Sequence, residues 1–175
     1  MKMRRRWLAV LPVLALLTAG CGYHVAGKAD LLPKELHTIA IPAFENATTR
    51  YKLTQRMAGA LTREFVTRTR YHIVPQAADA DAVLLGSVIN YFAYPTIFDT
   101  RKGRATGMQV VVILQVRLVK TAGGNVLYES GNMAIHNRYE ISADQARYFD
   151  ESDASLDRLS DDVAKRVVSA ILENF

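Results

Sequence analysis

The sequence contains a single cysteine, Cys21, among its 175 residues. One cysteine cannot form a disulfide within the chain, so the fold must be held together by packing alone. A nucleophilic serine of the common hydrolase type is also missing, because no Gly-x-Ser-x-Gly motif occurs. The glycine-rich stretch at Gly123 and Gly124 is instead typical of a hairpin turn. These absences give a hydrolase little support, and we predict that the chain is not an enzyme.

Metal ligands at a recognisable spacing are absent from the sequence as well. The four histidines are His24, His37, His72 and His136. None of them belongs to a motif such as His-Glu-x-x-His, so we interpret them as surface or strand-end residues. Asp79 and Asp81 lie in an Ala-Asp-Ala-Asp run, which is typical of a turn rather than of an acid/base couple. We therefore predict neither a metal site nor a bound cofactor.

Beyond its first residues, the chain also lacks a marked excess of charge. Residues 1–20 hold four of the 22 basic residues and none of the 17 acidic ones, which leaves the rest with a net charge near +1. A nucleic-acid-binding domain is usually strongly basic, so we predict no nucleic-acid partner. The 155 residues that follow are enough for one domain with a single core.

The first twenty residues have the pattern of a bacterial secretory signal. A basic start around Arg5 precedes an apolar run from Trp7 to Leu17 and two small residues. This apolar run is too short to cross a bilayer as a helix, which needs about 20 residues. We therefore predict a signal peptide over residues 1–20, removed directly before Cys21.

Cys21 would be the first residue of the mature chain, and it resembles the acylated cysteine of bacterial lipoproteins. In that class the thiol carries a diacylglycerol and the new amino group takes an N-acyl chain, and two lipid signals suffice for stable membrane attachment. Gly22 stands where inner-membrane lipoproteins tend to have Asp, which is similar to cargo of the outer membrane. We expect a lipid anchor on the periplasmic face of the outer membrane. An ordinary signal peptide with a chance cysteine is the alternative.

The mature chain divides into a tether and one domain. Residues 21–36 show little periodicity, so we predict a lipidated N-terminus and tether there, followed by a single domain over residues 37–175. Thr38 to Phe44 has the pattern of a strand, and Tyr71 to Pro75 that of a second short strand. Between them, we expect the polar segment from Asn46 to Thr48 to end the first strand and to cap a helix.

Two segments show helical periodicity. The first apolar stripe consists of Leu53, Met57, Leu61 and Phe65. The second consists of Leu156, Leu159, Val163, Val167 and Ile171. We interpret both as core-facing stripes of amphipathic helices, with Ser155 as a candidate cap of the second helix.

Three long segments rich in Val, Ile, Leu and Tyr lie between the helices, at Ala82 to Ile97, Ala105 to Thr121 and Asn125 to Tyr139. In the middle segment every second residue from Met108 to Leu118 is apolar, which indicates a strand with one buried face. Tight turns between the segments would make them antiparallel. The whole pattern predicts an α+β fold with two amphipathic helices on one face of a mixed, mainly antiparallel sheet.

The lengths of these elements predict an incompletely covered sheet. A helix of about 20 residues spans roughly 30 Å, whereas a strand of about 16 residues reaches roughly 50 Å. We therefore expect part of the long strands to project as a slab with two exposed faces. A surface of that kind usually needs a partner to cover it.

Basic residues are expected to gather at one end of this slab. The candidate lipid-binding residues are Arg101, Lys102, Arg104, Arg138 and Arg147. Aromatic residues such as Phe92 and Tyr94 lie just behind the first three in the sequence. Guanidinium groups bind phosphates and aromatic rings suit acyl or sugar surfaces, so a phosphorylated glycolipid would satisfy both. The alternative is that the loops simply collect solvated charges.

Several short segments together resemble one known family. They are Cys21-Gly22-Tyr23-His24, the strand Thr38-Ile39-Ala40-Ile41-Pro42 and the Asn46 turn, followed by an arginine-rich amphipathic helix and long β-hairpins. Over essentially the mature chain, this order resembles the LptE family of lipopolysaccharide-assembly lipoproteins. The resemblance implies a plug inside the β-barrel protein LptD that supports assembly of the barrel and binds lipopolysaccharide through basic positions at the end loops of the sheet. Arg101, Lys102 and Arg104 match one such loop, and Arg147 follows the last strand.

Other outer-membrane lipoproteins share the Ile-Ala-Ile-Pro-x-Phe-x-Asn segment at positions 39–46. Activators of peptidoglycan synthases and curli-type secretion lipoproteins have a similar start. The chain would then be a regulatory module or a pore subunit, and the sequence leaves this alternative open.

Overall fold

A computed structural model describes residues 33, 35–100, 103–140 and 148–173. The elements in chain order are β1 (Thr38–Ala40), β2 (Glu45–Asn46), α2 (Tyr51–Arg68), β3 (His72–Val74), the 3-10 turn η1 (Ala77–Asp79), β4 (Ala82–Asp99), β5 (Arg104–Lys120), β6 (Val126–Glu140) and α3 (Tyr148–Glu173). Neither of the two helices in this described part is long and apolar enough to cross a bilayer.

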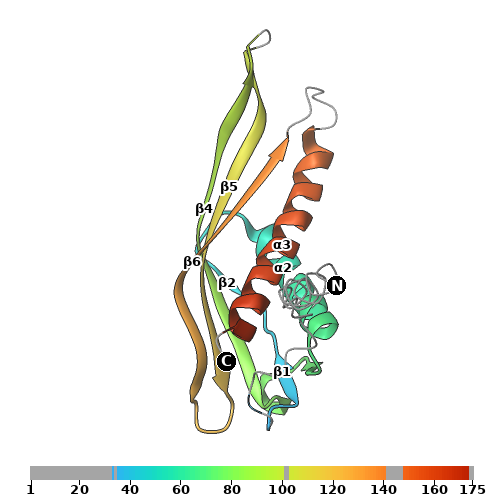
Figure 1. Cartoon of the computed structure of the whole chain (residues 1–175), viewed down its shortest axis with the longest axis vertical. Helices are drawn as coiled ribbons and strands as arrows, with labels where there is room; N and C mark the ends of the chain where they lie inside the picture. Colours follow the sequence, from blue (N-terminus) through green and yellow to red (C-terminus); the bar gives the residue numbers. More distant parts are fainter. Residues whose placement is uncertain (1–32, 34, 101–102, 141–147, 174–175) are drawn as a thin grey trace, which may run out of the picture.

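The strands form one mixed sheet in the order β3-β1-β4-β5-β6. The two-residue strand β2 pairs with β4, farther along that strand than β1 does. The pairs β1–β3, β1–β4 and β2–β4 are parallel. The pairs β4–β5 and β5–β6 are antiparallel. Helices α2 and α3 pack against each other and lie on the same side of the sheet (Figure 1). The predicted α+β fold is therefore confirmed.

The core lies between the two helices and one face of the sheet. In β5 the buried residues are Val110, Val112, Leu114, Val116 and Leu118. The helices contribute Leu53, Met57, Leu61, Phe65, Leu159, Val163, Val167 and Ile171. The apolar stripes read from the sequence therefore face the core, because alternation in a strand and 3.6-residue periodicity in a helix each gather apolar side chains on one side.

The strand predicted from Thr38 to Phe44 is confirmed only in its first part, because β1 ends at Ala40 and β2 begins at Glu45, after the predicted end. The chain leaves the sheet at Pro42, which has no N–H group to donate to a strand ladder. Phe44 is buried at this break and packs on Gly86 of β4, where an added Cβ would lie 2.2 Å from the phenyl ring.

Both expected helix caps are also wrong. Asn46 Oδ1 accepts hydrogen bonds from the N–H and the hydroxyl of Thr48, at 2.8 and 2.7 Å, and so closes the turn after β2 as expected. Helix α2 begins only at Tyr51, however, and Arg50 at its N-cap makes no side-chain cap hydrogen bond. Ser155 lies inside α3, which begins at Tyr148, because the apolar pattern marks only the turns that pack on the core.

Tight turns join the long strands, as their glycines predict. Gly123 and Gly124 have φ values of 85° and 68° between β5 and β6, and Gly103 has a φ of 61° between β4 and β5. The N–H of Gly103 donates to the carbonyl of Asp99 at 2.8 Å. The β4–β5 hairpin extends beyond the first turn of α3 at the top of Figure 1. The expectation that the helices leave part of the sheet uncovered is confirmed.

Candidate functional site

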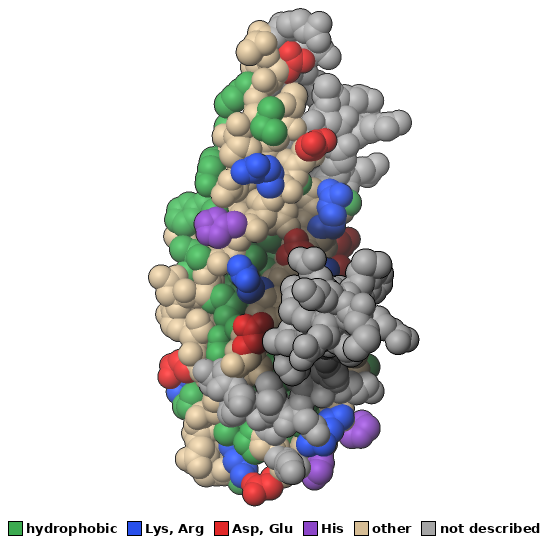
Figure 2. All heavy atoms as spheres, in the orientation of Figure 1, with side chains coloured by type: hydrophobic (Ala, Val, Ile, Leu, Met, Phe, Trp, Pro, Cys, Tyr) green, Lys and Arg blue, Asp and Glu red, His purple; other side chains and the backbone are tan. Residues whose placement is uncertain are grey.

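The sheet face turned away from the helices carries exposed apolar side chains near the β4–β5 hairpin. The exposed fractions are 47% for Phe92, 45% for Tyr94, 48% for Ile97 and 58% for Phe98. Phe92 pairs with Val111 and Tyr94 with Gln109, which alternate with β5 residues that face the core. These four β4 residues therefore share the uncovered face, and we call them the open-face patch. Hydrophobic side chains are visible along the margin formed by the long strands in Figure 2.

Two irregularities in β4 enlarge the open-face patch. Register shifts lie on both sides of Ile97, so Ile97 pairs with Gly107 and the next residue, Phe98, pairs with Ala105. Gly107 and Ala105 lie two residues apart and share a face, so two consecutive apolar residues point the same way. Ile97 lies close over Gly107, where an added Cβ would be 3.0 Å from its side chain. Sequence alternation could not reveal this, because each shift reverses the pattern.

Polar residues of β5 and β6 lie on the same face, with Gln109 and His136 beside the patch and the pair Arg117–Glu129 farther toward the β5–β6 hairpin. Gln109 Nε2 lies 3.4 Å from His136 Nδ1, and Arg117 Nε lies 3.3 Å from Glu129 Oε1. The exposed Arg138 pairs with Gln109 across the ladder. The face is thus apolar toward the hairpin and polar along β6.

The basic residues selected from the sequence occupy different places. Arg138 lies beside Gln109, five residues along β5 from Arg104, which corresponds to roughly 17 Å. Arg138 is therefore not at the shared tip that we expected. Arg104 begins β5 opposite Asp99, and its side chain is outside the described part. Arg101, Lys102, Arg147 and Cys21 lie outside the described residues.

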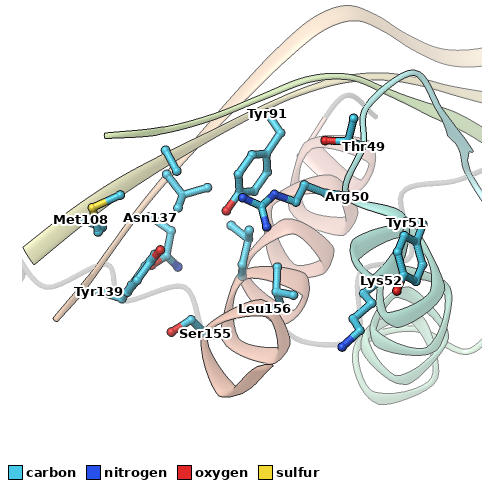
Figure 3. A pocket seen from close by; sticks show the side chains of 13 residues that line it. Thr49, Arg50, Tyr51, Lys52, Tyr91, Met108, Asn137, Tyr139, Ser155 and Leu156 are labelled. Carbon is cyan, nitrogen blue, oxygen red and sulfur yellow. The ribbon is translucent and has the colours of Figure 1, made fainter. Parts of the chain in front are cut away.

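A cleft of about 390 Å³ opens on the helix side of the sheet. It lies between the first turn of α2, the first half of α3 and the strands β4, β5 and β6 (Figure 3). The apolar part of its wall consists of Tyr91, Met108, Val110, Tyr139, Leu156 and Leu159. Arg50 and Lys52 belong to its polar part. Sequence analysis missed the cleft because its walls come from elements far apart in the chain.

The electrostatics of the cleft centre on Arg50 and Tyr91. The Arg50 guanidinium lies 5.2 Å from the centroid of the Tyr91 ring, which is the geometry of a cation–π contact. Burial raises the pKa of the Tyr91 hydroxyl, and the nearby charge of Arg50 opposes this effect. Among the described residues, no ion pair joins a carboxylate to Arg50. The sequence signal that could have indicated this positive site is Arg50, which directly precedes a helix with no acidic residue in its first turn.

Asp81 makes hydrogen bonds that connect two strands of the sheet. Asp81 accepts hydrogen bonds from His37 and Thr38 and so links β1 to the start of β4. Among the described residues, no group of three or more His, Cys, Asp or Glu side chains is placed to hold a metal ion.

The arrangement of long strands and two helices is a fold found in other bacterial proteins. A candidate lipoprotein from Caulobacter crescentus CB15 superposes with a TM-score of 0.52 at 14% identity, over 76% of this chain and 88% of that one. A hypothetical protein from Chlamydia trachomatis gives 0.50 at 11% identity, over 78% and 98%. The rare lipoprotein B of Shewanella oneidensis gives 0.49 at 14% identity, over 79% and 96%. The first two likenesses define a shared α+β fold.

Within this fold, the sequence assigns the chain to one family. Residues 36–171 match the LptE family, described as "Lipopolysaccharide-assembly". The chain belongs to the LptE family. No curated protein sequence matches it.

Proposed function

We propose that this chain is an outer-membrane lipoprotein that inserts its sheet into an LptD-like β-barrel, supports assembly of that barrel and binds lipopolysaccharide on its way to the outer leaflet. The lipid on Cys21, made of a diacylglycerol and an N-acyl chain, would anchor it on the periplasmic face. The role requires no catalytic step and no further cofactor. Membership of the LptE family supports the general assignment.

The open-face patch carries the docking part of the proposal. A single exposed apolar residue is common on protein surfaces, but a continuous group marks an interaction site. Phe92, Tyr94, Ile97 and Phe98 follow one another along a hairpin that the helices do not cover. Beside them, Gln109, His136 and Arg138 offer polar contacts to the polar inner wall that is typical of a barrel lumen.

Lipopolysaccharide binding rests on the basic residues. Arg101, Lys102, Arg104 and Arg147 are the positions that match the family, and Arg138 is exposed on the open face. Guanidinium groups form bidentate hydrogen bonds with phosphates, so these residues would compete with divalent cations for the phosphates of lipid A.

Substitution of the patch tests the docking. Phe92→Asp combined with Tyr94→Asp places two charges where a barrel wall would have to desolvate them. We expect the amount of LptD-like barrel that co-purifies from detergent-solubilised membranes to fall by about tenfold. Val126→Asp is the matched control, since Val126 is an exposed strand residue (43%) near the opposite hairpin.

The same purification separates the alternatives. A barrel that co-purifies equally with the double variant and with the control would refute the docking surface. A peptidoglycan synthase, or a ring of identical subunits, recovered in place of a barrel would favour the other lipoprotein classes instead.

A further inference from the structure

The cleft on the helix side of the sheet is separate from the open-face patch, because the two lie on opposite faces of β4 and β5. Its apolar wall rests on the core, since the lining residues Tyr91, Tyr139 and Leu156 are partly buried and pack against it. The volume of about 390 Å³ falls in the range of small-molecule sites. An apolar cavity of about 150 Å³ accepts benzene, so this cleft has space for one acyl chain of medium length.

The cationic residues of the cleft lie away from Met108 and Tyr139, and the side formed by Met108 and Tyr139 also carries the polar residues Asn137 and Ser155. In Figure 3, Met108 and Tyr139 lie at one side, Arg50 stands beside the Tyr91 ring in the centre, and Lys52 lies at the far side. Arg50 has no carboxylate partner among the described residues, and the first turn of α2 contains no acidic residue. The positive end of the helix dipole therefore adds to the charge of Arg50. An anionic group next to an apolar chain matches this distribution.

We propose that the cleft binds one acyl chain of a phosphorylated lipid, with the chain along Met108, Tyr139 and Leu156 and the phosphate at Arg50. The proposal builds on the proposed lipid-transport function and adds a site apart from the hairpin loop. Lipid A and phospholipids share this chemistry, and the experiment below distinguishes them.

Photo-crosslinking in the membrane tests the site with the full chain. We would place p-benzoylphenylalanine at Tyr139, which lies along the proposed path of the acyl chain, irradiate cells grown with radioactive phosphate, and identify the adduct by mass spectrometry. A second probe at Met108 gives the same readout should the first substitution impair folding. We expect a phosphate-labelled lipid adduct at either position.

Cleft substitutions show whether the adduct depends on this site. Ala93→Trp fills the cleft from β4, and Arg50→Gln removes the charge at the phosphate position. Each is expected to lower the adduct yield by about tenfold, the worth of a charge-assisted hydrogen bond or more. Ala77→Trp and Arg166→Gln, at exposed positions outside the lining, are the matched controls and should leave the yield unchanged.

Each outcome decides the proposal. A lipid A adduct or a phospholipid adduct that both cleft substitutions reduce supports it and identifies the source. No lipid adduct from either probe, or an adduct that neither substitution affects, overturns it. A third probe at His136, on the open face, reports the barrel independently. A barrel adduct at His136 without a lipid adduct at Tyr139 would refute the lipid site and leave the docking proposal standing. A lipid adduct at Tyr139 without a barrel adduct at His136 would refute only the docking proposal.

Discussion

Asp81 holds the start of β1 against the start of β4. Its Oδ2 atom accepts hydrogen bonds from the N–H groups of His37 and Thr38, at 2.8 and 2.9 Å, and from the Thr38 hydroxyl at 3.0 Å. The two backbone donors stabilise the charged carboxylate and lower the pKa of Asp81 below its ordinary value, more strongly than burial raises it. The sequence indicated only a turn here, because local patterns cannot show a contact between residues 43 positions apart.

Asp81→Asn is expected to destabilise the fold at neutral pH by about 1 kcal/mol, a modest value because the carboxylate is solvent-accessible. Because the pKa of Asp81 is lowered in the folded state, its contribution is complete above the pKa of the unfolded chain and is lost as the pH falls through the lowered value. Urea denaturation at about pH 7 and about pH 3 measures this difference. Asp79→Asn is the control, and an equal effect of both substitutions at neutral pH would contradict the assignment.

Gly86 of β4 lies against Phe44, one residue before β4 pairs with β2 at Ser87. The phenyl ring occupies the place where a side chain at position 86 would begin. Glycine weakens a strand interior, so its presence here marks a close approach of another group. This contact explains how a chain interrupted at Pro42 returns to the sheet as β2.

Gly86→Ala is expected to destabilise the domain by roughly 1–3 kcal/mol, since a Cβ 2.2 Å from the Phe44 ring forces the core to rearrange. Chemical denaturation of this variant and of the unchanged protein measures the loss of unfolding free energy. Gly131→Ala in β6 is a matched control, because a Cβ there meets nothing within 4 Å. Equal stabilities of the two variants would show that Phe44 moves aside at no cost.

The regular parts of the elements were predictable, and the irregular parts were not. The stripes in α2 and α3, the alternation in β5 and the glycine turns follow from local periodicity, and the structure confirms them. The pairing order was not predictable, because β1 joins β3 and β4 through contacts distant in the sequence. The register shifts beside Ile97 were also missed, since they depend on how β4 fits β5.

The molecule is elongated, with β1 and the β4–β5 hairpin at opposite ends (Figure 1). Strand β4 alone runs from the β1 pair at Ala82 to the hairpin at Asp99, which corresponds to roughly 56 Å. A tether over residues 21–36 could reach at most a similar distance, about 55 Å. A lipid on Cys21 would therefore not by itself fix the orientation of the sheet.

The basic residues between β4 and β5 offer a test of lipopolysaccharide binding that is separate from the test of docking. We expect reversal of charge at Arg101, Lys102 and Arg104 together to weaken binding of lipopolysaccharide by the purified protein, by about tenfold or more, and to leave co-purification of the barrel intact. The matched control reverses Arg158, Lys165 and Arg166, three exposed residues of α3. Unchanged binding in the hairpin variant would remove this loop from the mechanism.

The two candidate surfaces differed in how far the sequence revealed them. The pattern of elements predicted both helices on one face of the sheet, which leaves the other face open. The element lengths predicted that the long strands project beyond the helices. The cleft is formed where Arg50, Tyr91 and Leu156 meet, and no local pattern links these three residues.

The placement of β1 has a consequence for the order in which the newly made chain can fold. Ile39 pairs with Ile73 of β3 on one side and with Ala82 of β4 on the other, so β1 joins segments that lie well apart in the sequence. Contacts between distant segments form slowly. Strand β1 therefore cannot pair until β3 has been synthesised, and its place in the sheet is completed only when Ala82 and Val83 of β4 follow.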